Sequence, residues 1–294
     1  MQTRLRRAVA TATATIVVSA GLAATSGTAL AAAPPVIAVH MHSTDFSVGS
    51  PTTRRAGRVT FAVSTDARQG GSLNIFKTSP GVTAQQVMKE IVADITGAPK
   101  VAAAATRALV RDARFYGGAD VVPGTPMRVT ETLYAGTYFL VDVSQVFALH
   151  KFTSLHVLHV FGSPVATSFP ATSATVFQTS ADRFVAPSVL PATGTVLVHN
   201  SADTIHFMDL QPLKPGTTDA QLQAGFDQIL KGQHPTSDPT LGPPVGMGVI
   251  SPGKQVLLSY ALKPGTYALL CFISDDKTGA PHAFMGMHKV IQLR

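Results

Sequence analysis

Short stretches of alternating apolar and polar residues, bounded by Gly, Pro or Ser, recur along most of the chain. Alternation with a period of two is typical of strands that bury one face. In the first half it predicts strands over 36–42, 59–64, 127–133 and 137–143. In the second half it predicts strands over 175–178, 195–199, 204–210, 255–262 and 289–293. Strands at this spacing favour an all-β fold of the antiparallel sandwich type.

One helix is predicted between the middle strands of each half. Thr83 and Thr218 each stand three residues before a glutamine, which is the spacing of a capping box. Apolar residues then follow at helical spacing, so we expect them to face the core: Val87, Ile91 and Ile95 in the first half, and Leu222, Phe226, Ile229 and Leu230 in the second. The first half also carries a helix-prone, Ala-rich insert at 98–113.

Four segments of the first half recur in the second half in the same order. The clearest pair is Ala135-Gly-Thr-Tyr-Phe-Leu-Val-Asp142 and Pro264-Gly-Thr-Tyr-Ala-Leu-Leu-Cys271. Internal similarity of this kind predicts two tandem copies of one domain. We place the copies at 34–165 and 175–294, joined by a linker over 166–174 that is rich in Ser, Thr, Pro and Ala.

The N-terminal segment has the features of a secretory signal peptide over residues 1–31. Arg4, Arg6 and Arg7 precede an apolar stretch, and Ala29-Leu30-Ala31 forms a small-residue cleavage site. A retained N-terminal anchor is the alternative interpretation. No later segment approaches the run of about 18 apolar residues that a membrane span needs. We therefore expect a secreted, extracytoplasmic protein of the cell envelope, without a membrane span after cleavage.

Charge and cysteine content narrow the possible functions. Cleavage of the signal would remove three arginines and lower the formal net charge from +7 to +4, without leaving any run of Lys or Arg. A nucleic-acid partner is therefore not expected. With a single cysteine, Cys271, no internal disulfide can form. A lone thiol in an exported protein is either a buried apolar residue or a metal ligand.

The strongest chemical signal follows the last repeated segment. Cys271 stands at the end of a predicted strand, and His282 and Met287 come after it. Thiolate, imidazole and thioether are together the ligand set of a mononuclear copper site.

Three segments of the second copy together resemble the cupredoxin (plastocyanin-like) superfamily. They are Val198-His-Asn-Ser-Ala-Asp-Thr-Ile-His206, the strand that ends in Cys271, and His282-x-x-x-x-Met287 followed by a closing strand. The resemblance covers most of residues 172–294. It implies two tandem Greek-key cupredoxin-like β-sandwiches, each with one inserted helix. It also implies copper held by His206, Cys271 and His282, with Met287 as the axial ligand.

The loop after the cysteine departs from the family pattern. Ten residues, 272–281, separate Cys271 from His282, where plastocyanin-type loops are much shorter. The turn sequence Asp275-Asp-Lys-Thr-Gly279 could return His282 to the cysteine or carry it to solvent. Two other interpretations stay open: Cys271 is simply a buried apolar residue, or a cluster of His282, Met285, Met287 and His288, with Met208 and Met247 near it, carries Cu(I).

The first copy lacks this ligand set. Asn74 and Asp142 stand where the alignment of the repeat places His206 and Cys271. His40-Met-His42 puts two imidazoles on one face of a strand, either as a weak chelate or as two solvent-facing side chains.

The chain has neither a Gly-x-Ser-x-Gly elbow nor a phosphate loop, and it lacks the set of several His-x-His motifs that a multicopper oxidase has, so we do not expect an enzyme. Two hypotheses follow. Either the second copy binds copper for electron transfer with an unknown protein redox partner or for copper handling, or the protein is a metal-free interaction or structural module of the envelope with a degenerate copper site.

Overall fold

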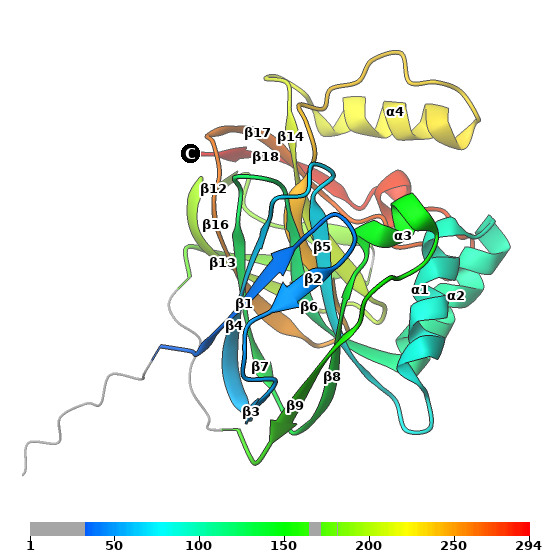
Figure 1. Ribbon diagram of the computed structural model, residues 1–294. Coiled ribbons are helices and arrows are strands. Elements are labelled where there is room, and N and C mark those ends of the chain that lie inside the picture. The colour runs from blue at the N-terminus through cyan, green and yellow to red at the C-terminus, as the bar shows by residue number, and fades with distance from the viewer. Residues whose placement is uncertain (1–32, 165–171, 181) are drawn as a thin grey trace, which may run out of the picture. The chain divides into compact units, whose positions relative to one another are not determined.

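The computed structural model describes residues 33–164, 172–180 and 182–294 (Figure 1). The expected signal peptide and residues 166–171 of the expected linker lie outside these residues. The chain from Ala33 to Arg294 forms one compact unit.

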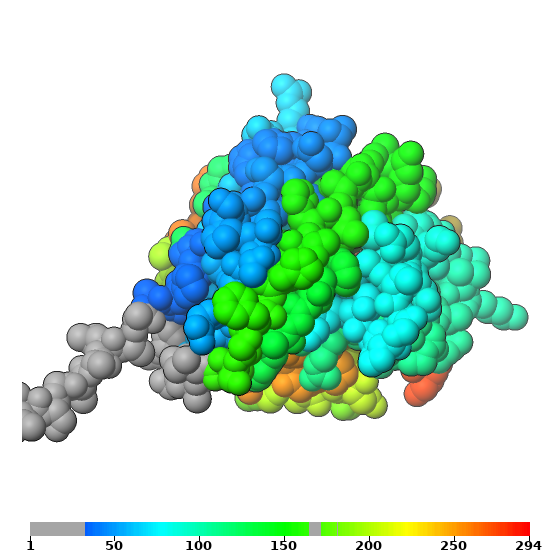
Figure 2. Space-filling view, turned by 60° about the horizontal axis from the view of Figure 1, so that its bottom comes forward, coloured from blue at the N-terminus to red at the C-terminus, as the bar shows by residue number. Residues whose placement is uncertain are grey.

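The first half contains nine strands and three helices among the described residues. Its strands are β1 (Val36–Met41), β2 (Phe46–Val48), β3 (Thr53–Arg55), β4 (Gly57–Thr65), β5 (Gly71–Thr78), β6 (Ala113–Val121), β7 (Met127–Leu133), β8 (Gly136–Asp142) and β9 (His156–Phe161). Its helices are α1 (Ala84–Thr96), α2 (Pro99–Asp112) and α3 (Ser144–Leu149). On the face drawn in Figure 2, the segment of α1 lies beside that of α3, and these two helices are in contact.

The second half repeats the strand count with fewer helices. Its strands are β10 (Ala174–Thr179), β11 (Arg183–Val185), β12 (Val189–Leu190), β13 (Thr193–Asn200), β14 (His206–Leu213), β15 (Val245–Ile250), β16 (Gln255–Ala261), β17 (Gly265–Leu270) and β18 (His288–Leu293). Its helices are α4 (Asp219–Leu230) and a short 3₁₀ helix, η1 (His282–Met285).

The strands form two sheets, and both halves contribute to each of them. The first sheet has the order β11-β10-β13-β16-β7-β4-β1-β2, and the second has the order β12-β18-β17-β14-β15-β6-β5-β8-β9-β3. Counted from the junction of the halves toward the edge of each sheet, both halves supply equivalent strands in the same order. In the first sheet, for example, β7-β4-β1-β2 of the first half corresponds to β16-β13-β10-β11 of the second. The halves join edge to edge at β16–β7 and at β15–β6, both antiparallel. The predicted all-β fold of two cupredoxin-like sandwiches is confirmed, and neither sheet is interrupted between the halves.

The core is built by the alternation that predicted the strands. In β4, for example, Val59, Phe61 and Val63 are buried, and Thr60 pairs its hydroxyl with that of Thr130 on β7. Side chains of the two sheets meet in one apolar cluster that extends through both halves. Alternate side chains of a strand point to opposite faces of the sheet. The side chains that face the core are therefore the apolar positions of the predicted alternation.

The inserted helices begin where their caps predicted. Thr218 and Gln221 form the full capping box of α4, and the Thr83 hydroxyl accepts from the Gln86 amide at the start of α1. The second half has one helix between its middle strands, as expected. The first half has both α1 and α2 at that place, because the Ala-rich insert is also helical.

The expected core face of α4 is only partly correct. Leu222 is buried, but Ile229 is 42% and Leu230 is 52% exposed. The C-terminal end of α4 extends beyond the strands that its first turns cover, so its last apolar residues have nothing to pack against (Figure 1).

Candidate metal centre

Cys271 follows β17 directly and is completely buried. β17 lies between β14 and β18 in the second sheet. In the β14–β17 register Asp209 pairs with Leu270, which places Cys271 beyond the last pair and diagonal to His206 at the start of β14. Diagonal neighbours on adjacent strands are within reach of each other's side chains. The sheet therefore brings His206 to Cys271 from 65 residues away in sequence.

The ten-residue insertion folds back as a hairpin-like turn. The Asp275 amide donates to the Ala280 carbonyl at 2.8 Å, and the Gly279 amide donates to the Asp275 carbonyl at 2.9 Å. The Asp275 carboxylate accepts from the Thr278 amide and hydroxyl. On the return, the His282 amide donates to the Ile273 carbonyl and the Ala283 amide to the Cys271 carbonyl. The turn thus returns His282 to the cysteine rather than carrying it to solvent.

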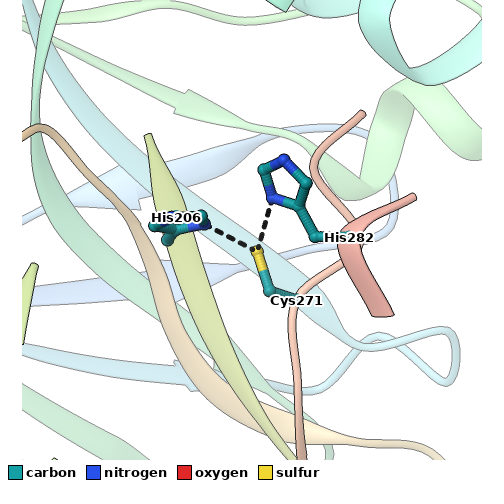
Figure 3. Close-up of side chains that lie close together, drawn as sticks. All are labelled: His206, Cys271 and His282. Atoms are coloured by element: carbon teal, nitrogen blue, oxygen red, sulfur yellow. Dashed lines mark hydrogen bonds between the residues drawn. The ribbon is translucent and has the colours of Figure 1, made fainter. Parts of the chain in front are cut away.

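The three side chains converge on one point (Figure 3). The Cys271 Sγ atom lies 3.7 Å from His206 Nδ1 and 3.9 Å from His282 Nδ1. All three donor atoms lie within 4.8 Å of one another, and the two imidazole centroids are 4.9 Å apart. Around a first-row ion with bonds of about 2.3 Å to sulfur and about 2.0 Å to nitrogen, trigonal angles give a sulfur–nitrogen separation of about 3.7 Å. The donor spacing fits a shared metal ion.

Burial keeps these three groups uncharged in the metal-free protein. Desolvation lowers the pKa of His206 to about 3, with a further contribution from His282, and it also lowers the pKa of His282. Desolvation raises the pKa of Cys271 to about 12, against the backbone hydrogen bonds from Phe207 and Ile273. Both imidazoles therefore offer free lone pairs at neutral pH, whereas the thiol must lose a proton on metal binding.

Two carboxylates that sequence reasoning missed lie behind the imidazoles. Asp182 Oδ1 is 3.7 Å from His206 Nε2, and Asp182 and Asp275 form a group with His282. Both carboxylates oppose the lowering of the His282 pKa. Carboxylates in this outer position orient imidazole ligands and increase their basicity. Asp275 belongs to the turn that the sequence singled out, but nothing in the sequence connects Asp182 to it.

Met287 lies close to this cluster in the chain and in the core. It is fully buried and belongs to the same apolar cluster as Cys271. Gly286 precedes it with φ of 103°, which lets the chain reverse after η1, and the Met287 amide donates to the His282 carbonyl. Its role as axial ligand stays a prediction.

The proposed Cu(I) cluster is not assembled as one group. His288 uses Nδ1 toward the Asp219 carboxylate at 3.1 Å and Nε2 toward the Gln223 amide oxygen at 2.9 Å. Met285 is 38% exposed and accepts from the Thr278 hydroxyl. Met208 and Met247 are buried opposite each other in β14 and β15.

The first half differs from the second at both ligand strands, although not as the sequence alignment indicated. In the first half Asn74 pairs with Val141, and at the equivalent position of the second half Asp209 pairs with Leu270. Gly71 pairs with Val121 as His206 pairs with Ile250. The position of His206 is therefore taken by Gly71, and placing Asn74 there was wrong by three residues. Among the described residues, no His–Cys–His group occurs in this half.

Helices of the first half hold the Cys271–His282 loop of the second half. The buried Thr106 hydroxyl of α2 lies 2.9 Å from the Ser274 carbonyl and 2.8 Å from the Asp94 carboxyl. The Arg107 guanidinium donates to the Asp276 carbonyl. A Cβ atom at Gly279 would meet the Pro99 carbonyl oxygen at 1.9 Å. The Ala-rich insert, which carried no functional signal in the sequence, thus packs on the loop that places His282.

A cavity of about 560 Å³ lies next to the cluster, between the two halves. Its wall includes Phe207 and Ile273, whose backbone groups contact the Cys271 sulfur, and three carboxyl side chains, Asp94, Asp120 and Asp209. Burial raises the pKa of Asp120 to about 6 and that of Asp209 well above its usual value, and the nearby Asp120 carboxyl raises the pKa of Asp209 further.

No family model matches the sequence, and a comparison with curated proteins found no match. Among solved structures, auracyanin from Roseiflexus castenholzii is 17% identical over 41% of this chain and 94% of its own, with a TM-score of 0.25. Copper nitrite reductase from Nitrosomonas europaea is 12% identical over 89% of this chain and 94% of its own, with a TM-score of 0.26. Blue copper oxidase from Nitrosomonas europaea is 11% identical over 89% and 86%, with a TM-score of 0.25.

These TM-scores are low, so the fold class rests on the strand order and pairing of the chain itself. Fold and donor cluster together define a two-sheet β-sandwich protein with one His–Cys–His group in the second half of its described residues. Among all the residues that the structure describes, no helix combines the length and apolar character that a membrane crossing requires.

Proposed function

We propose that this protein binds one copper ion in its second half and uses it for electron transfer or copper handling outside the cytoplasm. His206, Cys271 and His282 would be the equatorial ligands and Met287 the axial one. A trigonal His₂Cys set with a long thioether bond supports one-electron exchange between Cu(II) and Cu(I). The observation that carries the proposal is the placement of two imidazole Nδ1 atoms at 3.7 and 3.9 Å from one buried sulfur.

The chemistry of these donors favours copper over the other interpretation of Cys271. A cysteine that served only as an apolar filler needs no imidazole beside it, and burying two imidazoles is costly unless their nitrogens have partners. The Nδ1 atoms of both imidazoles instead point to the Cys271 sulfur at 3.7 and 3.9 Å, where a shared metal ion would satisfy both lone pairs. A soft thiolate with two imidazoles suits copper.

Export and duplication belong to the same proposal. The segment 1–31 has signal-peptide composition, and the halves 34–165 and 175–294 share their strand order, which supports tandem copies of which one retains the centre. A non-enzymatic role is proposed because the sequence has no set of His-x-His motifs like that of a multicopper oxidase, no Gly-x-Ser-x-Gly elbow and no phosphate loop.

Addition of Cu(II) to the purified protein tests the proposal. We expect one equivalent to bind with the intense visible absorption of a thiolate–copper bond. Cys271→Ser should abolish the absorption, and Met287→Leu should keep it but raise the reduction potential, since the thioether tunes the potential. His234→Ala, at an exposed loop position, is the matched control and should change neither.

A colourless protein that keeps a titratable thiol after Cu(II) addition would contradict copper binding at Cys271. It would favour the metal-free module, and the search for a partner would then turn to the cell envelope. N-terminal sequencing of the exported protein checks the processing, with Ala32 as the expected first residue.

A further inference from the structure

A second group of metal-ligating side chains lies in the first half, away from the proposed copper centre. It consists of His40, His42 and Asp66, whose donor atoms all lie within 4.8 Å of one another. His40 Nε2 is 3.6 Å from Asp66 Oδ2, and His42 Nδ1 is 3.5 Å from Asp66 Oδ1. These separations are longer than most hydrogen bonds, so both imidazoles face the carboxylate at ion-pair distance without a short hydrogen bond to it.

The register of two parallel strands produces this arrangement. In the β1–β4 pair, His40 lies beside Ser64 and Met41 beside Thr65, so the next positions along both strands bring His42 and Asp66 together. Met41 is fully buried between the two histidines, which fixes both imidazoles on the outer face. The Thr65 hydroxyl donates to the Met41 carbonyl, and the His42 amide donates to the Asp45 carbonyl. The backbone on both sides is therefore held.

Ser64 selects the donor atom of His40. His40 Nδ1 is 2.9 Å from the Ser64 hydroxyl, which leaves Nε2 as the nitrogen that faces Asp66. An outer hydrogen bond to one ring nitrogen is how proteins orient imidazole ligands. The two rings are 4.8 Å apart and edge to face, so their lone pairs can converge without a steric clash.

We propose that His40, His42 and Asp66 form a second, solvent-accessible site for a divalent first-row cation, with Cu(II) as the preferred ion. His40 Nε2 lies 3.6 Å from Asp66 Oδ2 and His42 Nδ1 lies 3.5 Å from Asp66 Oδ1, so the carboxylate faces both imidazoles. Small side-chain movements would bring these donors to the shorter separations of a tetragonal site. Nitrogen and oxygen donors suit Cu(II), which binds most strongly among these ions. The site lacks a thiolate, and its partly exposed side chains leave coordination positions for water.

Cu(II) titration of the full chain, followed by electron paramagnetic resonance, tests the second site. We expect an equivalent of Cu(II) without thiolate absorption, in addition to the one at Cys271. His42→Ala should remove it and leave the thiolate band unchanged. Ser64→Ala should weaken it about tenfold and Ser64→Thr should restore it. His234→Ala is the control.

The same measurement on the Cys271→Ser chain separates the two sites. Substoichiometric Cu(II) should broaden the imidazole resonances of His40 and His42 before that of His234. The proposal is wrong if the His40→Ala/His42→Ala chain binds as many equivalents as the unaltered protein, or if all three resonances broaden together. If the Cys271 centre binds no copper, a single equivalent that disappears in His42→Ala still supports the second site.

Discussion

The His206 side chain has the most perturbed environment of the imidazoles in the described residues. It is fully buried, and burial lowers its pKa to about 3. In the unfolded chain its pKa is about 6.5, so between these values the unfolded state binds a proton that the folded state does not. Stability must therefore fall as the pH falls from about 6.5, by up to about 1.4 kcal/mol per pH unit for this one group.

His206→Asn should remove this acid sensitivity in the metal-free protein. We expect the free energy of unfolding of the variant to depend less on pH between about 6.5 and 4 than that of the unaltered protein. Denaturant titrations at a series of pH values measure it, and His234→Asn, at an exposed position, is the control. Parallel pH dependences for the two variants would contradict the burial of a neutral imidazole. Buried acids with raised pKa values make the protein more stable as the pH falls, which opposes the effect of His206. The test is therefore the difference in pH dependence between the two variants.

At the scale of elements, the Cys271–His282 loop depends on its support from α1 and α2. Gly279→Ala should displace the loop, because the added Cβ meets the Pro99 carbonyl at 1.9 Å, and it should lower copper affinity and stability by about 1–3 kcal/mol each. Gly232→Ala is a matched control, with φ of 71° against 74° and open space around the Cβ. Isothermal titration with copper and thermal unfolding measure both effects.

Thr106→Val tests the same contact without a clash. The substitution keeps the shape of the side chain but leaves the Ser274 carbonyl and the Asp94 carboxyl without the hydroxyl. An unsatisfied buried group costs about 1–3 kcal/mol, so we expect lower stability together with weaker copper binding. If Thr106→Val and Gly279→Ala lower stability but leave copper affinity intact, the helices support the fold alone and not the centre.

Strands with strong alternation could be predicted from the sequence, whereas β6 and β15, which join the halves in the second sheet, could not. β7 was predicted at its observed bounds, and β4, β13 and β16 within a few residues. β6 and β15 carry Gly118, Gly246 and Gly248, where a Cβ would lie 1.8 to 2.7 Å from a carbonyl oxygen of the neighbouring strand. Close packing there requires glycine, and glycine has the pattern of a loop.

The candidate site shows the same division. Cys271, His282 and Met287 were singled out as candidates because thiolate, imidazole and thioether together are a copper ligand set, and the turn residues predicted a reversal. The direction of that reversal depends on contacts with α2, and the approach of Asp182 to His206 depends on the position of β11. Both contacts join residues far apart in sequence, so neither could be predicted from it.

At the scale of the whole molecule, the two halves meet across a pair of buried carboxyls. Asp120 of β6 and Asp209 of β14 both pair with Gly246 of β15, and both lie in the wall of the cavity. Desolvation raises both pKa values, that of Asp120 to about 6. The folded protein thus binds protons that the unfolded chain, with Asp at about 3.9, has lost. Their contribution to stability is complete below about pH 4 and is lost as the pH rises through the folded values.

Asp209→Asn should therefore stabilise the protein at pH 8. The amide has nearly the shape of the carboxyl and can donate to Asp120, but it needs no proton to stay neutral in the cavity. We expect its free energy of unfolding at pH 8 to exceed that of the unaltered protein, with the gain shrinking toward pH 5. Asp45→Asn, at an exposed position, should show no such trend. An equal gain in the free energy of unfolding at pH 5 and pH 8 would contradict this prediction. It would mean that the carboxyl pair is already ionised in the folded protein at pH 5.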